Sequence, residues 1–381
     1  MRLDDICTVF NDGDWIESKN QSEKGIRLIQ TGNIGEGKYL EKEERAKYIS
    51  EETFNSLKCT EIFPGDILVS RLPEPVGRAC IIPEKSERMI TAVDCTICRP
   101  DKNIISKEYL CYFMQSKAYY TQLLNSITGT TRKRISRKNL GSIELNIPDK
   151  TTQKSVVEKL DLLSVIIENR KEEIEKLDEL IKARFVEMFG DPETNPKGWE
   201  KVTLNDVCSS IVRGPFGSAL KKDFFVAPDE TTYKVYEQKH AIQKSATIGT
   251  YYITKDKYQE LKRFECVAGD ILMSCSGTMG ELYQLPEDCE RGIINQALCK
   301  FTLNNRILPI CFLTYMRQTI GNLETKGSGI KNIAAVSYVK QMPINLPPLE
   351  VQREFEEFCK QVDKSKVAVQ KALDESAIII Q

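Results

Sequence analysis

The sequence predicts an α+β protein in which two mixed globular domains are joined by two long helices. Three observations favour this class: the two halves of the chain repeat each other, each half opens with a mixed strand-like and loop-like segment, and each ends in a stretch with an apolar seam that lacks glycine and proline. With 381 residues, the chain is long enough for two cores, at roughly 150 residues per domain.

The internal repeat is visible as three pairs of matching motifs, each separated by about 200 residues. Residues 3–7 (LDDIC) match 204–208 (LNDVC), and residues 65–70 (GDILVS) match 269–274 (GDILMS). Residues 143–148 (IELNIP) match 342–347 (MPINLP), and Gln153 matches Gln352 after them. One structural plan is therefore expected to occur twice.

The globular domains are predicted at residues 1–150 and 191–348. Short alternations of apolar and polar residues, as in 67–69 and 143–147, are typical of strands, and Gly, Pro and Asn interrupt them. Each domain is therefore expected to combine short strands with helices.

The first long helix is predicted at residues 151–190. Its apolar residues occupy alternating a and d positions of a heptad repeat and comprise Leu160, Leu163, Ile167, Ile174, Leu177 and Ile181. Gly190, Asp191 and Pro192 follow as a helix stop. At 1.5 Å per residue the helix would be roughly 55 to 60 Å long.

The second long helix is predicted at residues 349–381. Its seam steps by three and four residues and includes Phe355, Phe358, Val362 and Val369. Because each seam needs a partner to bury it, the two helices are expected to form an antiparallel coiled coil that relates the domains by pseudo-two-fold symmetry.

Composition bounds the class of protein. The chain has 41% hydrophobic and 29% charged residues, which is typical of a folded globular protein. No apolar run is long enough to cross a membrane, roughly 20 residues, and the first residues do not resemble a signal peptide. Thirteen cysteines, an odd number, favour buried thiols in a reducing compartment. A cytoplasmic location without membrane attachment is therefore expected.

Charge is distributed unevenly along the chain. The formal net charge is −1 overall, but residues 1–150 carry +1 and residues 191–348 carry +2, whereas the two helical stretches carry −2 each. A nucleic-acid surface is therefore expected as a local patch on the domains, and the acidic helices suit protein contacts better.

No catalytic constellation is predicted. His240 is the single histidine, which argues against Ser-His-Asp triads and most His-based zinc sites. Residues 345–348 (NLPP) superficially resemble an adenine methyltransferase motif but fit a junction between domain and helix. Cys95 and Cys98 have CxxC spacing without a second pair, so buried thiols are expected, and residues 32–37 (GNIGEG) are expected to form a turn.

A basic cluster at residues 130–138 is the main positive signal for DNA binding. It places five cations among small hydroxyl and apolar side chains, a composition suited to phosphate and base-edge contacts, although such runs can simply face water. The predicted contacts in this loop are Thr130, Thr131, Arg132, Lys133 and Arg134. The repeat places Lys331, in a polar loop, at the position of Arg132.

Two further loops could face a DNA groove. Residues 70–78 correspond to residues 274–280, and residues 211–218 open the second repeat. Glycine and proline there permit close backbone approach, and arginine can read guanine with two hydrogen bonds. The predicted DNA contacts in these loops are Arg71, Arg78, Arg213, Phe216, Ser218, Ser276 and Thr278.

The chain resembles the specificity subunits of type I restriction-modification enzymes over essentially its whole length. The resemblance is carried by residues 185–192 (FVEMFGDP) with 195–199 (NPKGW), by residues 212–218 (VRGPFGS), and by residues 346–352 (LPPLEVQ). The repeated order of domain and long helix makes the resemblance specific.

The resemblance implies two target-recognition domains, each reading one half of a bipartite asymmetric DNA sequence, with a spacer set by the helices. A rigid helical strut fits this arrangement, since half-sites on one face of DNA lie near multiples of about 34 Å. The implied partners are double-stranded DNA, two methyltransferase subunits and restriction/translocase subunits. No cofactor is expected on this chain, while S-adenosylmethionine, ATP and Mg²⁺ are implied in the partner subunits.

Two other function classes stay open at this stage. A stand-alone methyltransferase or nuclease would need cofactor or metal motifs and activity of the purified chain. A coiled-coil scaffold without direct sequence readout would bind DNA, if at all, without the salt dependence that phosphate contacts impose.

Overall fold

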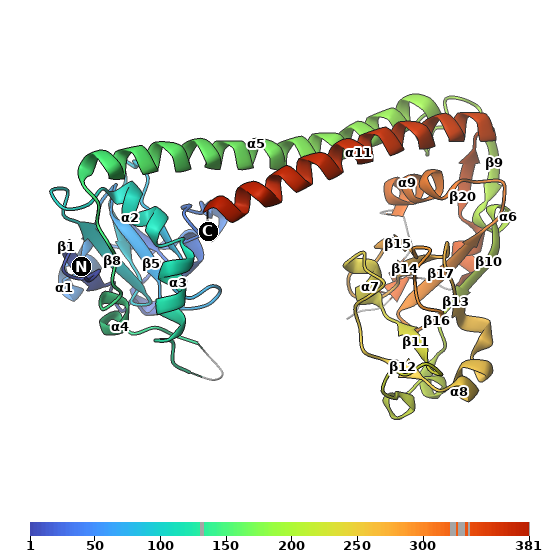
Figure 1. The fold of residues 1–381 in the computed structure, drawn as a ribbon, viewed down its shortest axis with the longest axis horizontal. Coiled ribbons are helices and arrows are strands. Elements are labelled where there is room, and N and C mark those ends of the chain that lie inside the picture. The colour runs from blue at the N-terminus through green and yellow to red at the C-terminus, as the bar shows by residue number, and fades with distance from the viewer. Residues whose placement is uncertain (130–132, 321–324, 327–331, 334–335, 381) are drawn as a thin grey trace. The chain divides into compact units, whose positions relative to one another are not determined.

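The computed structural model describes residues 1–381 except 130–132, 321–324, 327–331, 334–335 and 381. It divides into two compact units (Figure 1), which are unit 1, Met1–Glu172 with Val369–Gln381, and unit 2, Glu173–Ala368. This division cuts both long helices, whereas the four predicted segments ended at the helix termini. Each unit therefore contains one globular domain and a part of each helix.

Unit 1 contains two four-stranded sheets. The first has the order β1-β8-β5-β6 and consists of β1 (Cys7–Asp12), β5 (Ile67–Ser70), β6 (Ala79–Ile81) and β8 (Cys95–Pro100). The second has the order β3-β2-β7-β4 and consists of β2 (Ile26–Ile29), β3 (Tyr48–Ile49), β4 (Glu61–Ile62) and β7 (Met89–Thr91). In the second sheet β2 and β7 are parallel, and all other pairs in both sheets are antiparallel.

Unit 2 repeats both sheets strand for strand. The first has the order β10-β17-β14-β15, with β10 (Cys208–Arg213), β14 (Ile271–Ser274), β15 (Leu282–Gln284) and β17 (Leu298–Leu303). The second has the order β12-β11-β16-β13, with β11 (Tyr233–Tyr236), β12 (Tyr252–Ile253), β13 (Glu265–Cys266) and β16 (Gly292–Ile294). Again only β11 and β16 are parallel. The predicted repeat is confirmed at the level of strand order and direction.

Short helices surround the sheets. Unit 1 has α1 (Glu51–Leu57), α2 (Lys107–Phe113), α3 (Lys117–Leu124) and α4 (Arg137–Gly141). A serine precedes each of them as the N-cap. Its hydroxyl oxygen accepts a hydrogen bond from a backbone N–H of the first turn, which stabilises the start of the helix. Unit 2 has α6 (Leu204–Val207), α7 (Gln238–Ile242), α8 (Lys255–Glu260), α9 (Pro309–Thr319) and α10 (Val336–Gln341), and a small hairpin of β18 (Thr325–Lys326) and β19 (Asn332–Ile333).

The cores explain the repeated apolar motifs. All residues of β5 and of β14 are buried, because the sheets are covered on both faces. In unit 1 the main core joins the first sheet to α2, α3 and α4, and in unit 2 the equivalent core extends onto both long helices through Phe185, Phe189 and Phe355.

The start of each domain pairs with its end. In unit 2, β9 (Glu200–Thr203) and β20 (Pro343–Leu346) form an antiparallel pair. In unit 1 the same place is held by a bridge between Arg2 and Glu144. The methyltransferase-like residues 345–348 therefore lie at the junction of domain and helix, as expected, with Asn345 and Leu346 at the end of β20 and Pro347 and Pro348 just before α11.

A buried glutamine locks each domain to the helix that follows it. The Gln153 carboxamide accepts the Ser106 N–H (2.9 Å) and donates to two carbonyl oxygens. Gln352 likewise accepts the Leu308 N–H (2.8 Å) and donates to two carbonyl oxygens. Both side chains are at most 1% exposed. The three bonds recur because the two junctions share one geometry.

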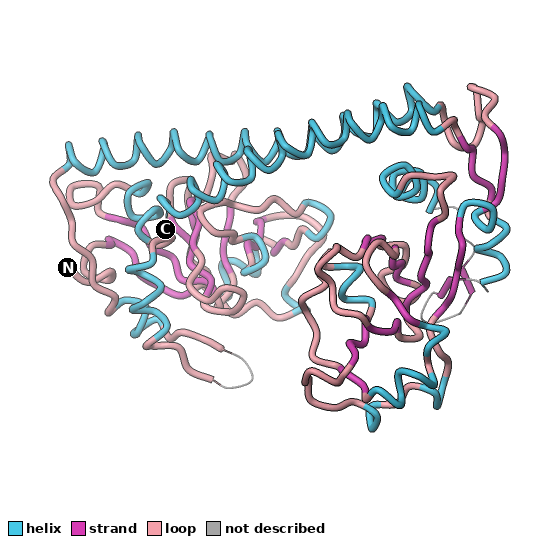
Figure 2. Tube along the Cα trace, turned by 45° about the vertical axis from the view of Figure 1, so that its right-hand side comes forward, coloured by secondary structure: helices cyan, strands magenta, loops and turns pink. Residues whose placement is uncertain are grey.

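The two long helices pair in antiparallel fashion within each unit. They are α5 (Lys150–Phe189) and α11 (Leu349–Ile380). In unit 1, Arg170 donates to the Ala372 carbonyl and the Ser376 hydroxyl. In unit 2, Asp178 pairs with Lys366 at 2.7 Å, and the rings of Phe185 and Phe355 lie 5.5 Å apart. Residue numbers rise along one helix as they fall along the other, and Figure 2 shows the helices side by side. The predicted antiparallel coiled coil is confirmed.

The predicted seam coincides with the less exposed side of the helices. Phe355 and Val362 are buried, and the partly buried seam residues are Leu160, Leu163, Ile167, Ile174, Leu177, Ile181, Phe358 and Val369. By contrast Leu162 is 63% exposed and Val165 55% exposed. Heptad spacing therefore separated the packed apolar residues from those that face outward.

The prediction that Cys95 and Cys98 are buried thiols is confirmed. Cys95 and Cys98 are free and fully buried on the central strand β8, and burial raises the pKa of Cys95 to about 12. Among the described residues, no helix is both long and apolar enough to cross a membrane.

Candidate nucleic-acid interface

Three segments meet at one end of the first sheet of unit 1. The loop after β5 begins with Arg71, whose N–H donates to the Asp94 carbonyl at 2.9 Å and whose carbonyl accepts the Ile135 N–H at 3.3 Å. The Arg134 guanidinium lies 3.0 Å from the Asp94 carboxylate. The structure thus brings the predicted loop of residues 70–78 next to the predicted basic loop.

The residues that flank the basic loop are paired. Thr128 and Arg134 exchange two backbone hydrogen bonds of 2.9 Å. Lys133 and Arg134 are exposed, so their charges can reach a phosphate. The other predicted contacts of the loop, Thr130, Thr131 and Arg132, lie outside the described residues.

Arg71 and Arg78 point into the protein. Arg71 is 5% exposed and donates to the Val93 carbonyl, with Asp12 at 3.3 Å. Arg78 is 9% exposed, and its guanidinium donates to four carbonyl oxygens at 2.6 to 2.9 Å. The donors used in these bonds are not available to a base edge. Both side chains hold the loop in shape, and their predicted direct contact with DNA stays a prediction.

Unit 2 presents an aromatic and a cation at the equivalent end of its sheet. Phe216 is 72% exposed, and the Arg213 guanidinium lies 5.6 Å from its ring centre. Arg213 Nε donates to the Gln296 carbonyl at 3.4 Å. Gly214 is required between them, because a Cβ there would lie 1.8 Å from the Asn295 carbonyl oxygen. An exposed aromatic ring beside a cation suits contact with a nucleotide.

The loop after β14 completes this end of unit 2. The Ser274 hydroxyl donates to the Thr278 carbonyl at 2.7 Å and accepts the Glu281 N–H at 2.9 Å, which fixes the turn. Ser276 is partly buried, and Thr278 and Ser218 are exposed. Lys331 lies outside the described residues.

A family model, described as type I restriction modification DNA specificity domain, matches residues 1–178 and 196–376. The chain belongs to this family.

Named relatives are specificity subunits. The HindI specificity subunit of Haemophilus influenzae is 25% identical over 170 residues, which are 44% of this chain and 36% of that subunit. A specificity subunit assigned to the enzyme MjaX of Methanocaldococcus jannaschii is 22% identical over 389 residues, covering 97% of this chain and 89% of that one. The chain thus spans about a third of the first relative and most of the second.

Solved structures share the fold. A chain from a type I R-M system, solved to explain complex assembly and conformational transition, matches with a TM-score of 0.64 at 17% identity, covering 100% of this chain and 93% of that chain. The two chains thus share their overall fold.

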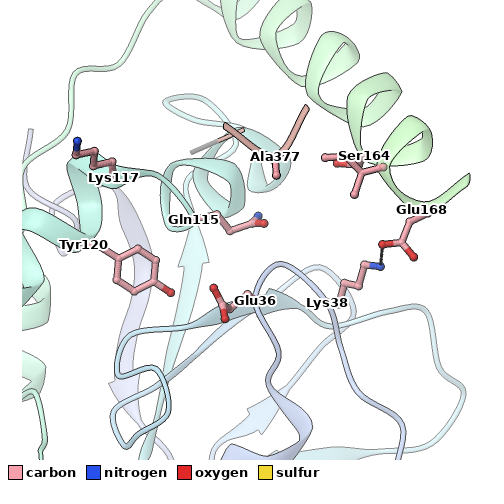
Figure 3. A pocket seen from close by; sticks show the side chains of 9 residues that line it. Glu36, Lys38, Gln115, Lys117, Tyr120, Ser164, Glu168 and Ala377 are labelled. Carbon is pink, nitrogen blue, oxygen red and sulfur yellow. Dashed lines mark hydrogen bonds and ion pairs between the residues drawn. The ribbon is translucent and has the colours of Figure 1, made fainter. Parts of the chain in front are cut away.

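In this member of the specificity-domain family, each unit has a groove between its domain and the paired helices. Figure 3 shows the groove of unit 1, about 470 Å³ in volume, where Lys38 of the domain pairs with Glu168 of α5 at 2.6 Å. The Tyr120 hydroxyl is buried without a hydrogen-bond partner, and burial raises its pKa to about 12. The equivalent groove of unit 2, about 340 Å³, is lined by three cations, Lys182, Arg317 and Lys366, and by two carboxylates, Asp178 and Asp363, whereas the charged residues of the unit 1 groove balance. The two grooves differ in charge although they have the same place in the fold.

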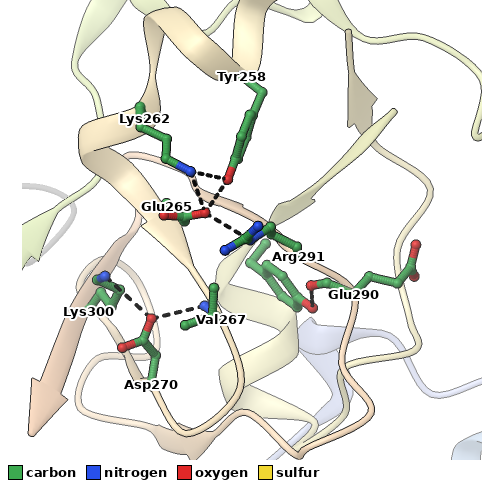
Figure 4. Close-up of polar contacts among 9 residues, drawn as sticks. Tyr258, Lys262, Glu265, Val267, Asp270, Glu290, Arg291 and Lys300 are labelled. Carbon is green, nitrogen blue, oxygen red and sulfur yellow. Dashed lines mark hydrogen bonds and ion pairs between the residues drawn. The ribbon is translucent and has the colours of Figure 1, made fainter. Parts of the chain in front are cut away.

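Buried carboxylates explain why the Gly-Asp-Ile-Leu motif occurs twice. Asp270 accepts the Val267 N–H at 3.0 Å and lies 3.3 Å from Lys300, as Figure 4 shows. Asp66 makes the same two kinds of contact, with a backbone N–H and with Arg99 at 2.7 Å. Both carboxylates hold the turn before a central strand, so the motif is structural.

A second carboxylate in Figure 4 ties strand β13 to its neighbours. Glu265 accepts hydrogen bonds from Lys262 (2.8 Å) and Tyr258 and lies 3.0 Å from Arg291. Burial alone would raise the pKa of Glu265, but these donors outweigh burial and lower it. Among the described residues, no group of three or more His, Cys, Asp or Glu is placed to hold a metal ion.

His240 has a structural role that sequence reasoning missed. Its Nδ1 accepts the Glu237 N–H at 2.9 Å and its Nε2 lies 2.7 Å from the Ile248 carbonyl, so the neutral ring with a proton on Nε2 satisfies both. Asn33 occupies the equivalent position in unit 1, where it accepts the Gln30 N–H and donates to the Leu40 carbonyl. The match of Asn33 with His240 at an offset of 207 was the available signal.

Unit 2 is therefore expected to lose stability in mild acid. Burial lowers the pKa of His240 below its ordinary 6.5, so the unfolded chain binds a proton more readily, and stability falls as the pH drops below about 6.5. Trp199, whose indole N–H donates to the Phe189 carbonyl at 2.9 Å, reports on unit 2 once Trp15 is replaced by phenylalanine. The free energy of unfolding is measured in urea at pH 7.5 and at pH 5.5. Its decrease between these pH values should be about 1 kcal/mol larger in the protein with His240 than in His240→Asn. Equal losses in the two proteins would remove His240 as the cause.

Proposed function

We propose that each unit reads one half of a bipartite asymmetric DNA site, and that α5 and α11 set the spacer between the two halves. The observation that carries this proposal is the duplicated two-sheet domain, in which predicted contact residues gather at one end of the first sheet in both copies. Membership of the specificity-domain family supports DNA as the ligand. The spacer role is supported by the continuous 40-residue helix α5, because a rigid helix can fix a distance.

The contacts proposed for DNA are the predicted ones other than Arg71 and Arg78. In unit 1 they are Lys133, Arg134 and the adjoining Thr130, Thr131 and Arg132. In unit 2 they are Arg213, Phe216, Ser218, Ser276, Thr278 and Lys331. Cations of this kind supply phosphate contacts, and the aromatic and hydroxyl groups can discriminate bases. Arg71 and Arg78 act indirectly by shaping their loop.

The chain is proposed to be non-catalytic and to recruit catalytic subunits. Two methyltransferase subunits, which bring S-adenosylmethionine, would dock on the helices and their grooves, and restriction/translocase subunits would bring ATP and Mg²⁺. The net charge of −2 on each helical stretch supports contacts with protein rather than with DNA.

The test is the adenine methylation pattern of cells that express the methyltransferase of the same system with and without this chain. One bipartite motif with a constant spacer is expected only when the chain is present. If the methyltransferase is active and no motif depends on the chain, the DNA-targeting function is wrong and a scaffold role takes its place.

A DNA-binding titration at several salt concentrations tests the basic loop. Replacing Arg132, Lys133 and Arg134 together by alanine should weaken DNA binding by the assembled enzyme at least tenfold and flatten its salt dependence, because each lost phosphate contact removes roughly 0.9 from the slope of log K against log salt. The control replaces three exposed helix cations, Lys154, Lys159 and Arg353, and should leave both quantities unchanged. Unchanged binding by the loop variant would exclude this loop from the interface.

A further inference from the structure

A second basic site lies in unit 1, away from the predicted DNA loops. It is a pocket of about 460 Å³, a size that accommodates a small ligand or a short peptide, at the start of α5. Four cations line it, namely Arg99, Lys102, Lys107 and Lys150, together with Asp66, Glu108 and the apolar residues Phe63, Pro64, Pro100 and Ile105.

Two of the four cations have no carboxylate partner. Arg99 is neutralised by two hydrogen bonds of 2.7 Å to Asp66, and Lys107 lies 3.9 Å from Glu108. The Lys150 ammonium donates only to the Lys102 carbonyl, at 2.7 Å. Within the described part of the chain, no acidic group pairs with Lys102 or Lys150. The pocket therefore keeps an excess of positive charge.

The pocket also offers an aromatic surface. Phe63 is 48% exposed, and the Arg99 guanidinium lies 4.9 Å from its ring centre. An exposed ring with a cation stacked on it, beside two prolines, can bury an apolar or aromatic side chain of a ligand. Charge and apolar surface are thus adjacent.

Comparison with unit 2 shows that the fold does not need Lys102, Lys107 or Lys150. Thr302 takes the place of Arg99 beside the first strand, and Pro309 takes that of Lys107 at the start of the equivalent helix. Leu349, three residues before Gln352, takes the place of Lys150, which lies three residues before Gln153. Asn305 lies in the turn of unit 2 that is equivalent to the turn with Lys102 in unit 1. In unit 2 the cations at this place have carboxylate partners, because Lys300 lies 3.3 Å from Asp270 and Arg306 lies 2.9 Å from Glu200. The cations that have no carboxylate partner within the described residues, Lys102 and Lys150, are therefore particular to unit 1, and they point to a ligand there.

DNA is not the ligand that this position favours. Gly65 and Asp66 line the pocket before β5, whereas Arg71 and its loop follow β5, and β8 likewise runs from the Asp94 side to the pocket at Pro100. Strands of four and six residues separate the two places by roughly 13 to 20 Å at about 3.3 Å per residue. The pocket and the candidate DNA interface therefore lie at opposite ends of one sheet.

We propose that this pocket binds an acidic segment of a partner protein, with carboxylates on Lys102 and Lys150 and an apolar or aromatic side chain on Phe63. The inference goes beyond the proposed function, because it holds whether or not the loops of unit 1 read DNA. It also gives the two units different partner surfaces at equivalent places.

The probe is a fluorescein-labelled peptide of two glutamates, one phenylalanine and two glutamates, titrated with the full chain and followed by fluorescence anisotropy. Binding should weaken about tenfold in Lys102→Asn with Lys150→Leu, which copies the residues of unit 2. The control Lys154→Ala removes an exposed cation of α5 outside the pocket and should bind like the original chain. Equal binding by all three proteins would overturn the proposal.

Two further experiments distinguish loss of peptide binding from a folding defect and from DNA binding at the same pocket. A peptide with glutamine in place of glutamate should bind at least tenfold more weakly, and Asn305→Lys with Leu349→Lys should add acidic-peptide binding to unit 2. If a 30-base-pair DNA duplex displaces the peptide, and the Lys102/Lys150 variant loses DNA affinity to the same extent, the pocket is a phosphate site and the proposal is wrong. Loss of peptide binding with DNA affinity unchanged supports it.

Discussion

Replacing Phe355 by alanine is expected to lower the free energy of unfolding of unit 2 by about 4 kcal/mol, the usual cost of deleting a buried aromatic side chain. Phe355 is fully buried, and its ring lies 5.5 Å from that of Phe185 and 5.1 Å from that of Phe189. The substitution would leave a cavity where α11 meets the last two turns of α5. Urea unfolding followed by Trp199 fluorescence in the Trp15→Phe background measures the loss.

Phe358→Ala is the matched control, because it removes the same side chain one turn further along α11. Phe358 is only partly buried and packs under the Arg184 guanidinium, 5.6 Å from its ring centre. A loss of about 1 to 2 kcal/mol is expected there. If both variants lose the same free energy, the aromatic cluster of Phe185, Phe189 and Phe355 is not what holds the helices together in unit 2.

Replacing Gln352 by alanine should lower the stability of unit 2 by about 3 kcal/mol. The side chain is fully buried and makes three hydrogen bonds of 2.8 to 3.0 Å, so its removal leaves one backbone N–H and two carbonyl oxygens without partners. Gln352→Glu should not restore stability, because a carboxylate cannot donate to carbonyl oxygens. The same urea titration applies.

Gln361→Ala, an exposed position on the same helix, should change stability by less than about 0.5 kcal/mol. Gln153→Ala should destabilise unit 1 as Gln352→Ala destabilises unit 2, and Trp15 fluorescence in a Trp199→Phe background would follow it. A small effect at both glutamines would mean that the junctions do not depend on these bonds.

The sequence predicted the large-scale fold because its signals are periodic. Both signals extend over many residues, so they can be recognised even where one residue departs from the pattern. One is the heptad spacing of Leu160, Ile167, Ile174 and Ile181, and the other is the offset between the repeated motifs. The limits of the strands were not predicted, because strands of two to four residues such as β3 and β4 carry too few alternations to stand out.

The candidate site was harder to predict from composition. Arginine in a glycine- and proline-rich loop suggests a DNA contact, yet Arg71 and Arg78 satisfy backbone carbonyls inside the domain. Whether a guanidinium turns inward depends on carbonyls contributed by distant segments, such as Val93 for Arg71 and Ile34 for Arg78. No local pattern contains that information.

Other functional and structural residues lacked any pattern within one repeat. Lys102 and Lys150 are 48 positions apart and look like ordinary surface lysines until the fold joins them in one pocket. Gln153 and Gln352 were visible as a matching pair, but their three-way hydrogen bonding depends on loops that precede them by more than 40 residues. Comparing the two repeats position by position recovers part of this signal.

Unit 1 consists of two separate segments of the chain, which affects the order in which the units can fold during biosynthesis. Unit 2 is one uninterrupted segment, Glu173–Ala368, whereas unit 1 needs Val369–Gln381 in addition to Met1–Glu172. Because a ribosome releases residues in order, at about 5 to 20 per second, the domain that is translated first waits for the last part of α11 before its helix pair can close. Unit 2 therefore can complete its tertiary structure before unit 1 does, although unit 1 leaves the ribosome first.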